Sequence, residues 1–336
     1  MLYVTTANKH DVFTAHYSLC HDCTKEGGLF LPYQMPKLSA GQIDALKNET
    51  FGDRVANILN LLFSTRLNGW DIDFCIGRSS VRLVSLNQRV LIAETWHNLD
   101  SDFCGLVRNV SDRLLSKEYI GTKPSRWIWI AVRVAVLFGV FGELEKIGLT
   151  DSGSKINFTV AAGDFSAPFA IWYAREMGLP VGNIIVSCDE NSGLWELLHN
   201  GQMRVDPGFT PRELERFIFA AAGHEAVQNF RDVLKKGGIY TPNALVFKKL
   251  RQGMIAEVVS RKRMESVICN TYSNYGYILE TDSAQAYSGL QNYMARAGET
   301  GAAVILAEKN PICSASTVAD AMGIGVRELK RLLDVT

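Results

Sequence analysis

Four side chains that can ionise or bind a metal ion gather between residues 97 and 104. They are His97, Asp100, Asp102 and Cys104. A thiol beside an imidazole can act as a nucleophile pair, and His, Cys and Asp together can hold a transition metal. Carboxylates close to a thiol oppose its ionisation by like-charge repulsion. The pattern therefore leaves a nucleophile and a metal site open, but it favours a solvated loop, and we expect no metal.

Two further patterns could also carry chemistry. Cys20 and Cys23 form a C-x-x-C pair, but no second pair lies at the spacing of a zinc ribbon. Thiols near a turn are therefore favoured over half of a metal site that is completed in space. The segment 235–263 holds eight Lys or Arg residues against Glu257 alone, which suits a solvated helical face or a site for an anion or acidic partner. We assign neither pattern a role.

The composition is typical of a soluble globular protein. The 336 residues predict roughly two domains, and with 47% apolar and 21% charged residues a core needs no disulfide or metal. Because 35 basic residues balance 35 acidic ones, nucleic acid is not an expected partner. The seven scattered cysteines and the lack of a visible targeting segment predict reduced thiols and a cytoplasmic protein.

Periodic patterns place these residues in an α/β chain. The apolar run 127–141, interrupted by Arg133, is shorter than the roughly 20 residues of a membrane span. It predicts a buried helix over 126–146 and no membrane association. Residues 156–188 predict a strand, a turn at 163–166, a helix and a second strand. This is the size of one βαβ unit, whose two strands are parallel.

Shorter elements are expected around this unit. Short strands are predicted at 81–86 and 89–93, and a polar helical stretch at 38–68. The residues T-P-R-E predict a capping box, with Thr210 as the N-cap and Glu213 as the third helical residue. The apolar face of the helix that follows is expected to contain Leu214, Phe217, Ile218 and Ala221.

Six short motifs follow one another across about 290 residues. They are E-G-G-L-F-L-P at 26–32, G-D-F-S at 163–166 with Y-A-R-E-M-G-L-P at 173–180, D-E-N at 189–191, P-R-E-L-E-R-F-I-F at 211–219, L-E-T-D-S-A at 279–284 and L-A-E-K-N-P at 306–311. In this order they resemble the motifs of the threonine synthase family, whose members use pyridoxal phosphate (PLP) and share the tryptophan-synthase-β fold, fold type II. The resemblance implies an N-terminal subdomain at 1–95 and a degenerate threonine-synthase-like large α/β domain at 96–336.

The resemblance places the cofactor lysine of the family at a residue that is not a lysine. The family stretch E-L-F-H-G-P-T-L-A-F-K-D is matched by residues 94–105, where Cys104 takes the place of the lysine. A thiol cannot form the Schiff base that holds PLP. The family's mobile lobe is also expected to be truncated, because residues 105–124 are too few for a βαβ unit. The matching residues in this stretch include Glu94, His97 and Phe103.

The resemblance further implies a degenerate cofactor site. Gly163 and Phe165 match the family's phosphate loop G-N-F-G, whereas Asp164 replaces asparagine and Ser166 replaces glycine. A carboxylate there would repel a phosphate group carrying about −1.5 to −2 charges. Glu308 stands where the family places a threonine against the pyridine nitrogen. We therefore expect no cofactor, with PLP as the alternative.

Three functions are compatible with this sequence. We favour a threonine-synthase-like protein that has lost PLP-dependent catalysis and serves in binding, scaffolding or regulation, with a small amino acid as a candidate ligand. The alternatives are a repurposed enzyme that uses Cys104 or His97 on a small, phosphorylated amino acid, and a PLP-dependent lyase that recruits another lysine. Loss of the lobe predicts an uncovered wall near Phe103, Trp127 and Trp129, and hence a homodimer or hetero-complex through that face.

Overall fold

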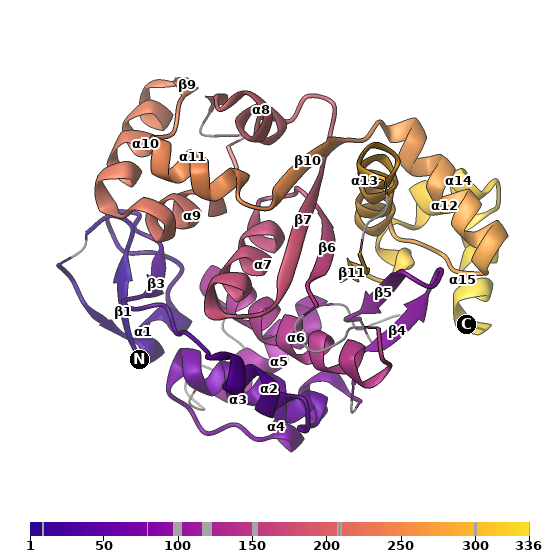
Figure 1. Ribbon diagram of the computed structural model, residues 1–336, viewed down its shortest axis with the longest axis horizontal. Helices are drawn as coiled ribbons and strands as arrows, with labels where there is room; N and C mark the ends of the chain where they lie inside the picture. The colour runs from indigo at the N-terminus through magenta and orange to yellow at the C-terminus, as the bar shows by residue number, and fades with distance from the viewer. Residues whose placement is uncertain are drawn as a thin grey trace.

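A central six-stranded sheet organises the chain (Figure 1). The computed structural model describes residues 1–8, 10–78, 80–96, 103–115, 123–149, 154–206, 208, 210–298 and 301–335. In spatial order the strands are β10 (Met254–Val258), β7 (Val181–Cys188), β6 (Ile156–Ala161), β11 (Ala303–Ala307), β5 (Val90–Glu94) and β4 (Arg82–Ser85). Only the edge pair β4–β5 is antiparallel. The carboxyl ends of the five parallel strands therefore meet at one edge, where open α/β sheets bind ligands.

The other elements surround this sheet. Before β4 they are β1 (Leu2–Thr5), β2 (Phe13–Thr14), α1 (Ala15–Cys20), β3 (Phe30–Pro32), α2 (Ala40–Leu46), α3 (Phe51–Phe63) and α4 (Gly69–Ile76). Between β5 and β10 they are α5 (Phe103–Leu114), α6 (Arg126–Lys146), α7 (Ser166–Met177), α8 (Gly193–Asn200), β8 (Met203–Val205), α9 (Glu213–Ala222), α10 (His224–Lys236), β9 (Gly238–Tyr240) and α11 (Ala244–Arg251). After β10 they are α12 (Arg261–Tyr275), α13 (Thr281–Ala297), the 3-10 helix η2 (Pro311–Ser314), α14 (Ala315–Met322) and α15 (Val326–Val335).

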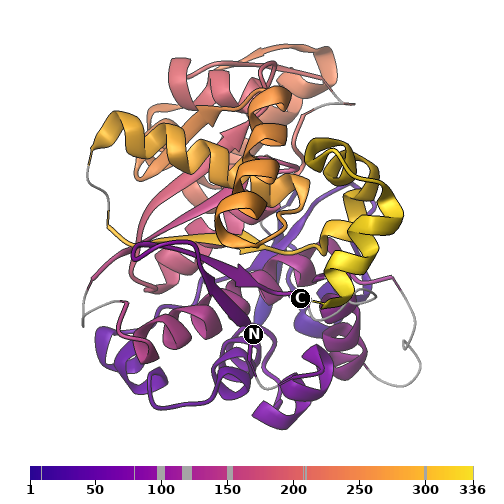
Figure 2. The ribbon, with the colours of Figure 1, turned by 90° about the vertical axis from the view of Figure 1, so that its right-hand side faces the viewer.

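The inner strands bury both of their faces, as parallel strands covered by helices do. Leu91 and Ala93 of β5 contribute to one core cluster, whereas Ile92 between them contributes to the other. Helix α7 packs on the first face with α6 behind it, and α13 packs on the second face beside α12. Helix α3 packs on the outer side of α6, and α2, α3 and α4 form the bottom layer in Figure 1, with the same end of the molecule at the bottom of Figure 2.

The structure confirms several elements predicted from periodicity. The βαβ unit is β6, α7 and β7 with parallel strands, and the short strands are β4 and β5. The predicted helical stretch 38–68 is divided between α2 and α3, and α4 follows it. Residues 82–94, which the prediction assigns to the N-terminal subdomain, form β4 and β5 of the central sheet.

The predicted capping box at the start of α9 is wrong. The Thr210 hydroxyl oxygen accepts a hydrogen bond from the backbone N–H of Asp206 at 2.8 Å, so it closes the preceding turn and does not cap the helix. Helix α9 begins at Glu213, whose carboxylate pairs with Arg216 inside the protein. The expected apolar face is present, with Leu214, Phe217 and Ile218 buried.

Helix α6 is the buried helix that the apolar run predicts. Within the described ranges it alone has the length and apolarity of a membrane span, and 83% of that stretch is buried inside the protein. The expectation of an uncovered aromatic wall is wrong. Trp127 and Phe103 are buried, and the Trp127 indole donates a hydrogen bond to the Tyr3 hydroxyl at 3.0 Å. The N-terminal sheet thus covers the start of α6, and Trp129 is half-buried.

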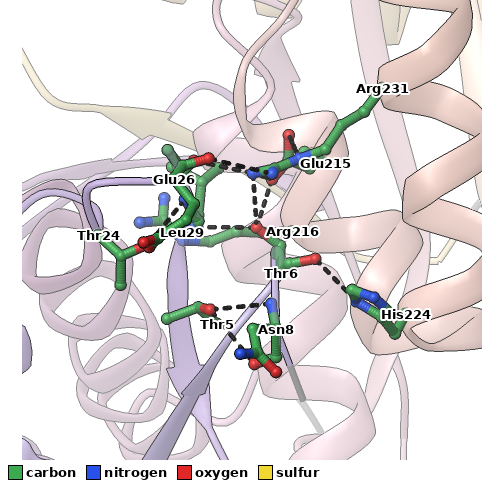
Figure 3. Close-up of polar contacts among 12 residues, drawn as sticks. Thr5, Thr6, Asn8, Thr24, Glu26, Leu29, Glu215, Arg216, His224 and Arg231 are labelled. Atoms are coloured by element: carbon green, nitrogen blue, oxygen red, sulfur yellow. Dashed lines mark hydrogen bonds and ion pairs between the residues drawn. The ribbon is translucent and has the colours of Figure 1, made fainter. Parts of the chain in front are cut away.

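A polar network joins the N-terminal sheet to α9 and α10 (Figure 3). The Arg231 guanidinium donates to both carboxylate oxygens of Glu215, at 2.7 and 3.0 Å, and to the carbonyl oxygen of Gly27 at 2.8 Å. Glu215 also accepts from the Thr6 hydroxyl. Arg231 therefore fixes the turn at 26–32 against two helices that lie about two hundred residues later in the sequence.

Arg216 makes a second connection between the same two motifs. Its Nε donates to the carbonyl oxygen of Phe30 at 3.0 Å, and its guanidinium pairs with Glu213. Both partners of this ion pair are buried. The motifs at 26–32 and 211–219 thus contact each other, and their shared role is to join the N-terminal sheet to the rest of the chain.

Candidate functional site

The residues that the resemblance assigns to a cofactor lie at the carboxyl ends of β6 and β11. The turn at 163–166 connects β6 to α7, and Glu308 directly follows β11. The backbone N–H of Phe103, the first residue of α5, donates to the carbonyl oxygen of Glu308 at 2.9 Å. The structure therefore brings Gly163, Asp164, Phe165, Ser166, Cys104 and Glu308 to one edge of the sheet.

The expected His–Cys cluster is described only in part. His97, Asp100 and Asp102 lie outside the described residues, so their relation to Cys104 stays a prediction. Cys104 is half-buried in the first turn of α5. All seven cysteines are described and none forms a disulfide. Among the described residues, no three His, Cys, Asp or Glu side chains are placed to hold a metal ion.

Arg133 of α6 is the residue at this edge that sequence reasoning missed. Its Nη2 donates to Glu308 Oε2 at 2.8 Å, and its Nε donates to Oε1, so the pair is bidentate. Its Nη1 donates to the Ser166 hydroxyl at 3.1 Å, and its guanidinium lies 4.8 Å from the centre of the Phe103 ring. Arg133 therefore connects α5, α7 and the end of β11. We call Arg133, Glu308, Ser166, Asp164 and Phe103 the Arg133 cluster.

Asp164 occupies the N-terminus of α7 within this cluster. Its Oδ1 accepts from the backbone N–H of Ser166 at 3.0 Å and also from the Ser166 hydroxyl. Its Oδ2 lies 3.4 Å from Arg126 Nη1 in a largely exposed ion pair. In many proteins the backbone N–H groups at the start of a helix bind an anion. Here the N–H group of Ser166 is instead hydrogen-bonded to the carboxylate of Asp164.

The positive charge of Arg133 is balanced within the Arg133 cluster by Glu308. Burial lowers the pKa of the Arg133 guanidinium, but the charge and hydrogen bonds of Glu308 outweigh this effect and the net pKa is raised. The Arg133 side chain is 12% exposed and that of Glu308 is 20% exposed. A buried charge is tolerated only when it is paired and hydrogen-bonded. Arg133 is therefore held as a cation by Glu308.

A small cavity lies beside the cluster. It measures about 60 Å³ and is bordered by Ala167, Glu280, Asp282, Glu308 and Lys309, among others. Small-molecule pockets usually measure about 300–1,000 Å³. Burial lowers the pKa of Lys309, but hydrogen bonding to Asp282 and neighbouring carboxylates raise it overall, so this lysine is an ammonium group.

A much larger cleft of about 1180 Å³ begins at Gly163 and extends past the ends of β7 and β10. We call it the acidic cleft because four carboxylates line it against two arginines. These residues are Asp189, Glu190, Glu196, Asp206, Arg204 and Arg261. Arg261 is itself paired with Glu265 at 2.8 Å. The cleft therefore favours a ligand that carries a positive charge.

Solved structures share the fold of this chain. PLP-bound threonine synthase from Brucella melitensis superposes with a TM-score of 0.80 at 19% identity, covering 99% of this chain and 94% of that one. Yeast threonine synthase superposes with a TM-score of 0.83 at 15% identity, covering 98% and 93%. The mixed α/β fold with its parallel sheet is that of the PLP enzymes of fold type II.

Sequence comparison narrows the class. Residues 2–80 match the model of the threonine synthase N terminus. Human threonine synthase-like 1 is 24% identical over 247 residues, which are 67% of this chain and 31% of that protein. Threonine synthase of Corynebacterium glutamicum is 24% identical over 214 residues, 58% of this chain and 44% of that enzyme. The chain is a homologue of the threonine synthase family, and it matches about a third of the length of threonine synthase-like 1.

Proposed function

We propose that this threonine synthase homologue has lost PLP-dependent catalysis and serves as a binding protein with a scaffolding or regulatory role. The observation that carries the proposal is the bidentate Arg133–Glu308 ion pair at the place that the family resemblance assigns to the pyridine ring. The reduced thiols of a chain without disulfides support a cytoplasmic location.

The residues at this edge do not fit PLP. Both carboxylate oxygens of Glu308 are engaged by Arg133, and Asp164 takes the N–H of Ser166 at the helix start. A phosphate bound there would meet the Asp164 carboxylate and would have to displace its hydrogen bonds. Cys104 at the lysine position offers no amine. The adjoining cavity of about 60 Å³ is too small for the substituted pyridine ring of PLP.

The acidic cleft supplies the binding surface in this proposal. Its carboxylates suit the ammonium group of a small amino acid, and Arg204 suits the carboxylate of the same molecule. The cleft is open at the ends of parallel strands, where ligands of this sheet type bind. No step of the binding requires a covalent bond to the protein.

Cofactor titration tests the loss of PLP chemistry. The purified protein is mixed with PLP, its visible absorption is recorded, and borohydride reduction is followed by peptide mass mapping. We expect no stoichiometric pyridoxyl adduct on any lysine. A stoichiometric adduct, with Lys309 as the first lysine to inspect, would overturn the proposal in favour of a PLP-dependent lyase.

Two engineered variants sharpen this test. Cys104→Lys alone is expected to gain no stoichiometric adduct, because the Arg133 cluster is still in place. Cys104→Lys combined with Arg133→Met and Glu308→Thr removes the ion pair and is expected to gain one. Full loading of the Cys104→Lys variant alone would show that the Arg133 cluster does not exclude the cofactor.

Calorimetric titration with the proteinogenic amino acids tests the binding role. Glu196 is an exposed residue of α8 that lines the acidic cleft, so Glu196→Gln should weaken binding of any amino acid found without affecting the fold. Glu328→Gln on the distant helix α15 is the matched control, and it should bind as the unmodified protein does. Equal effects of the two variants would contradict a site in the acidic cleft.

A scaffolding or regulatory protein acts by binding other proteins, so we also propose that the chain forms a homodimer or a hetero-complex. The buried Phe103 and Trp127 cannot form the contact. Among the described residues, Trp70 and Phe74 of α4 are the most exposed large apolar side chains, at 84% and 73%. Exposed aromatic pairs of this kind favour association. Light scattering that shows a monomer at high concentration, with no partner copurifying from the host, would contradict it.

A further inference from the structure

A second groove lies at the edge of the central sheet opposite the Arg133 cluster. It measures about 570 Å³ and is formed where β6, β7, β10 and β11 begin. The residues that line it include Lys155, Asn157, Arg175, Asn183, Gln252, Gly253 and Tyr293, and none of the described lining residues is acidic. We call it the N-edge groove. Its charge is therefore positive, in contrast to the acidic cleft at the other edge.

Arg175 in the last turn of α7 forms the inner wall of the N-edge groove. Its Nη2 is shielded from solvent and has no hydrogen-bond partner among the described residues. A methyl group on Gly253 would lie 2.5 Å from Arg175 Nη1, so the glycine, whose φ is +82°, makes room for the guanidinium. Burial lowers the pKa of Arg175, and the charge of neighbouring Glu176 opposes this only in part. A shielded guanidinium nitrogen without a partner costs stability unless a ligand pairs with it.

The neighbouring carboxylate does not satisfy this guanidinium. Glu176 Oε2 accepts from Lys249 Nζ at 3.1 Å and lies 3.9 Å from Lys37 Nζ. Lys155 at the start of β6 is exposed and forms no ion pair with a described residue. The N-edge groove therefore holds two cations whose charges are not balanced by the side chains that line it.

The amide and hydroxyl groups of the groove add oriented donors. Asn157 Oδ1 accepts from the backbone N–H of Asn183 at 2.7 Å, which leaves the amide NH₂ group as the remaining hydrogen-bonding group of Asn157. The Tyr293 hydroxyl oxygen accepts from Asn183 Nδ2 at 2.9 Å, so its own proton can be donated. These bonds fix the donors before any ligand arrives.

We propose that the N-edge groove binds a small molecule that carries a phosphate group. Arg175 contacts two phosphate oxygens through its planar guanidinium, and Lys155 supplies the second charge at the groove mouth. Two cations match the charge of about −1.5 to −2 that a phosphate monoester carries near neutral pH. The volume exceeds that of a bare ion and lies within the range of small-molecule pockets, which indicates an organic phosphate.

Calorimetric titration at low salt tests this site with two probes, inorganic phosphate and glycerol 3-phosphate, and with acetate as a carboxylate control. We expect saturable binding of both phosphate probes, tighter for the organic one, and no binding of acetate. Arg175→Gln should abolish binding, and Lys155→Gln should weaken it about tenfold, as loss of a charged hydrogen bond does. The exposed residue Lys330 on α15 is the matched control, because Lys330→Gln makes the same charge change away from the groove.

The outcomes separate this site from the proposed function. Because Lys155 is exposed, Lys155→Gln should keep the fold even if Arg175→Gln does not, and circular dichroism checks both. Absence of saturable binding, or equal affinity of the Lys155→Gln and unmodified proteins, would overturn the proposal. Binding of acetate as tight as phosphate would overturn the assignment of ligand class. A pyridoxyl adduct on the other edge would leave these results unchanged.

Discussion

Replacing Arg133 by methionine is the most direct perturbation of the candidate site. Methionine keeps the unbranched apolar stem that packs within α6 but removes the guanidinium. Glu308 then loses two hydrogen bonds from a bidentate partner, and the Ser166 hydroxyl loses a third. The carboxylate of Glu308, only 20% exposed, is left without its partner.

The expected loss of stability is large for a single substitution. Removing one partner of a fully buried ion pair costs about 3–5 kcal/mol. Because one fifth of the Glu308 side chain reaches solvent, we expect about 2–4 kcal/mol here. For a chain of 336 residues the unfolding entropy is about 0.7 kcal/mol/K, which converts this loss into a fall in melting temperature of about 3–6 °C.

A double-mutant cycle read by calorimetric melting is the assay. It compares Arg133→Met, Glu308→Leu and the double variant with the unmodified protein. The double variant removes both charges, so it should be more stable than the sum of the single losses predicts, with a coupling of about 1–3 kcal/mol. A fall of less than about 1 °C for Arg133→Met, or additive losses, would refute a structural ion pair at this edge.

Three further changes test other parts of the structure. Burial raises the pKa of the Glu94 carboxyl more than the hydrogen bond from Tyr277 lowers it, so the carboxyl loses its proton at a lower pH in the unfolded chain than in the folded protein. The free energy of unfolding should therefore fall as the pH rises above about 4. Melting curves should therefore show the stability of Glu94→Gln rising relative to that of the unmodified protein between acid and neutral pH, and a constant difference would contradict this. Arg231→Lys should cost about 1–3 kcal/mol and expose the turn at 26–32 to limited proteolysis, while Lys235→Arg on the same helix should do neither. Cys104 should react with iodoacetamide no faster than an ordinary thiol, and the Cys104→Ser variant should have the melting temperature of the unmodified protein. Labelling of the Cys104 peptide ten times faster than that of the other cysteines would favour the repurposed enzyme.

Elements with strong periodicity could be predicted from the sequence. The βαβ unit at 156–188 and helix α6 were predictable because alternating or continuous apolar residues and clear stop residues agree at those places. The start of α9 was not, because the hydroxyl of Thr210 had a nearer partner in Asp206. Short polar side chains satisfy whichever backbone group is closest, and spacing alone does not identify that group.

The candidate site could be predicted only in part. The family resemblance located Glu308 and the turn at 163–166, but it gave no reason for a glutamate there. Arg133 carried a usable signal, because a single charge within the buried apolar run 127–141 requires a partner. That partner lies 175 residues away, and no periodic pattern connects the two. The buried state of Trp127 was missed for the same reason, since its contact with Tyr3 spans 124 residues.

The Arg133–Glu308 pair also bears on how reversible this site is under mutation. A substitution that introduces an uncharged residue at 308 leaves the Arg133 guanidinium enclosed with no carboxylate, and a substitution at 133 leaves the Glu308 carboxylate without its partner. Each single substitution is therefore less stable than the chain that keeps both charges and the chain that has lost both. The free energy of unfolding of natural proteins is about 5–15 kcal/mol in all. A single variant that loses several kcal/mol of it is therefore easily removed by selection. Positions 133 and 308 are therefore coupled in evolution, because one charge can be lost without a large fall in stability only if the other is lost with it.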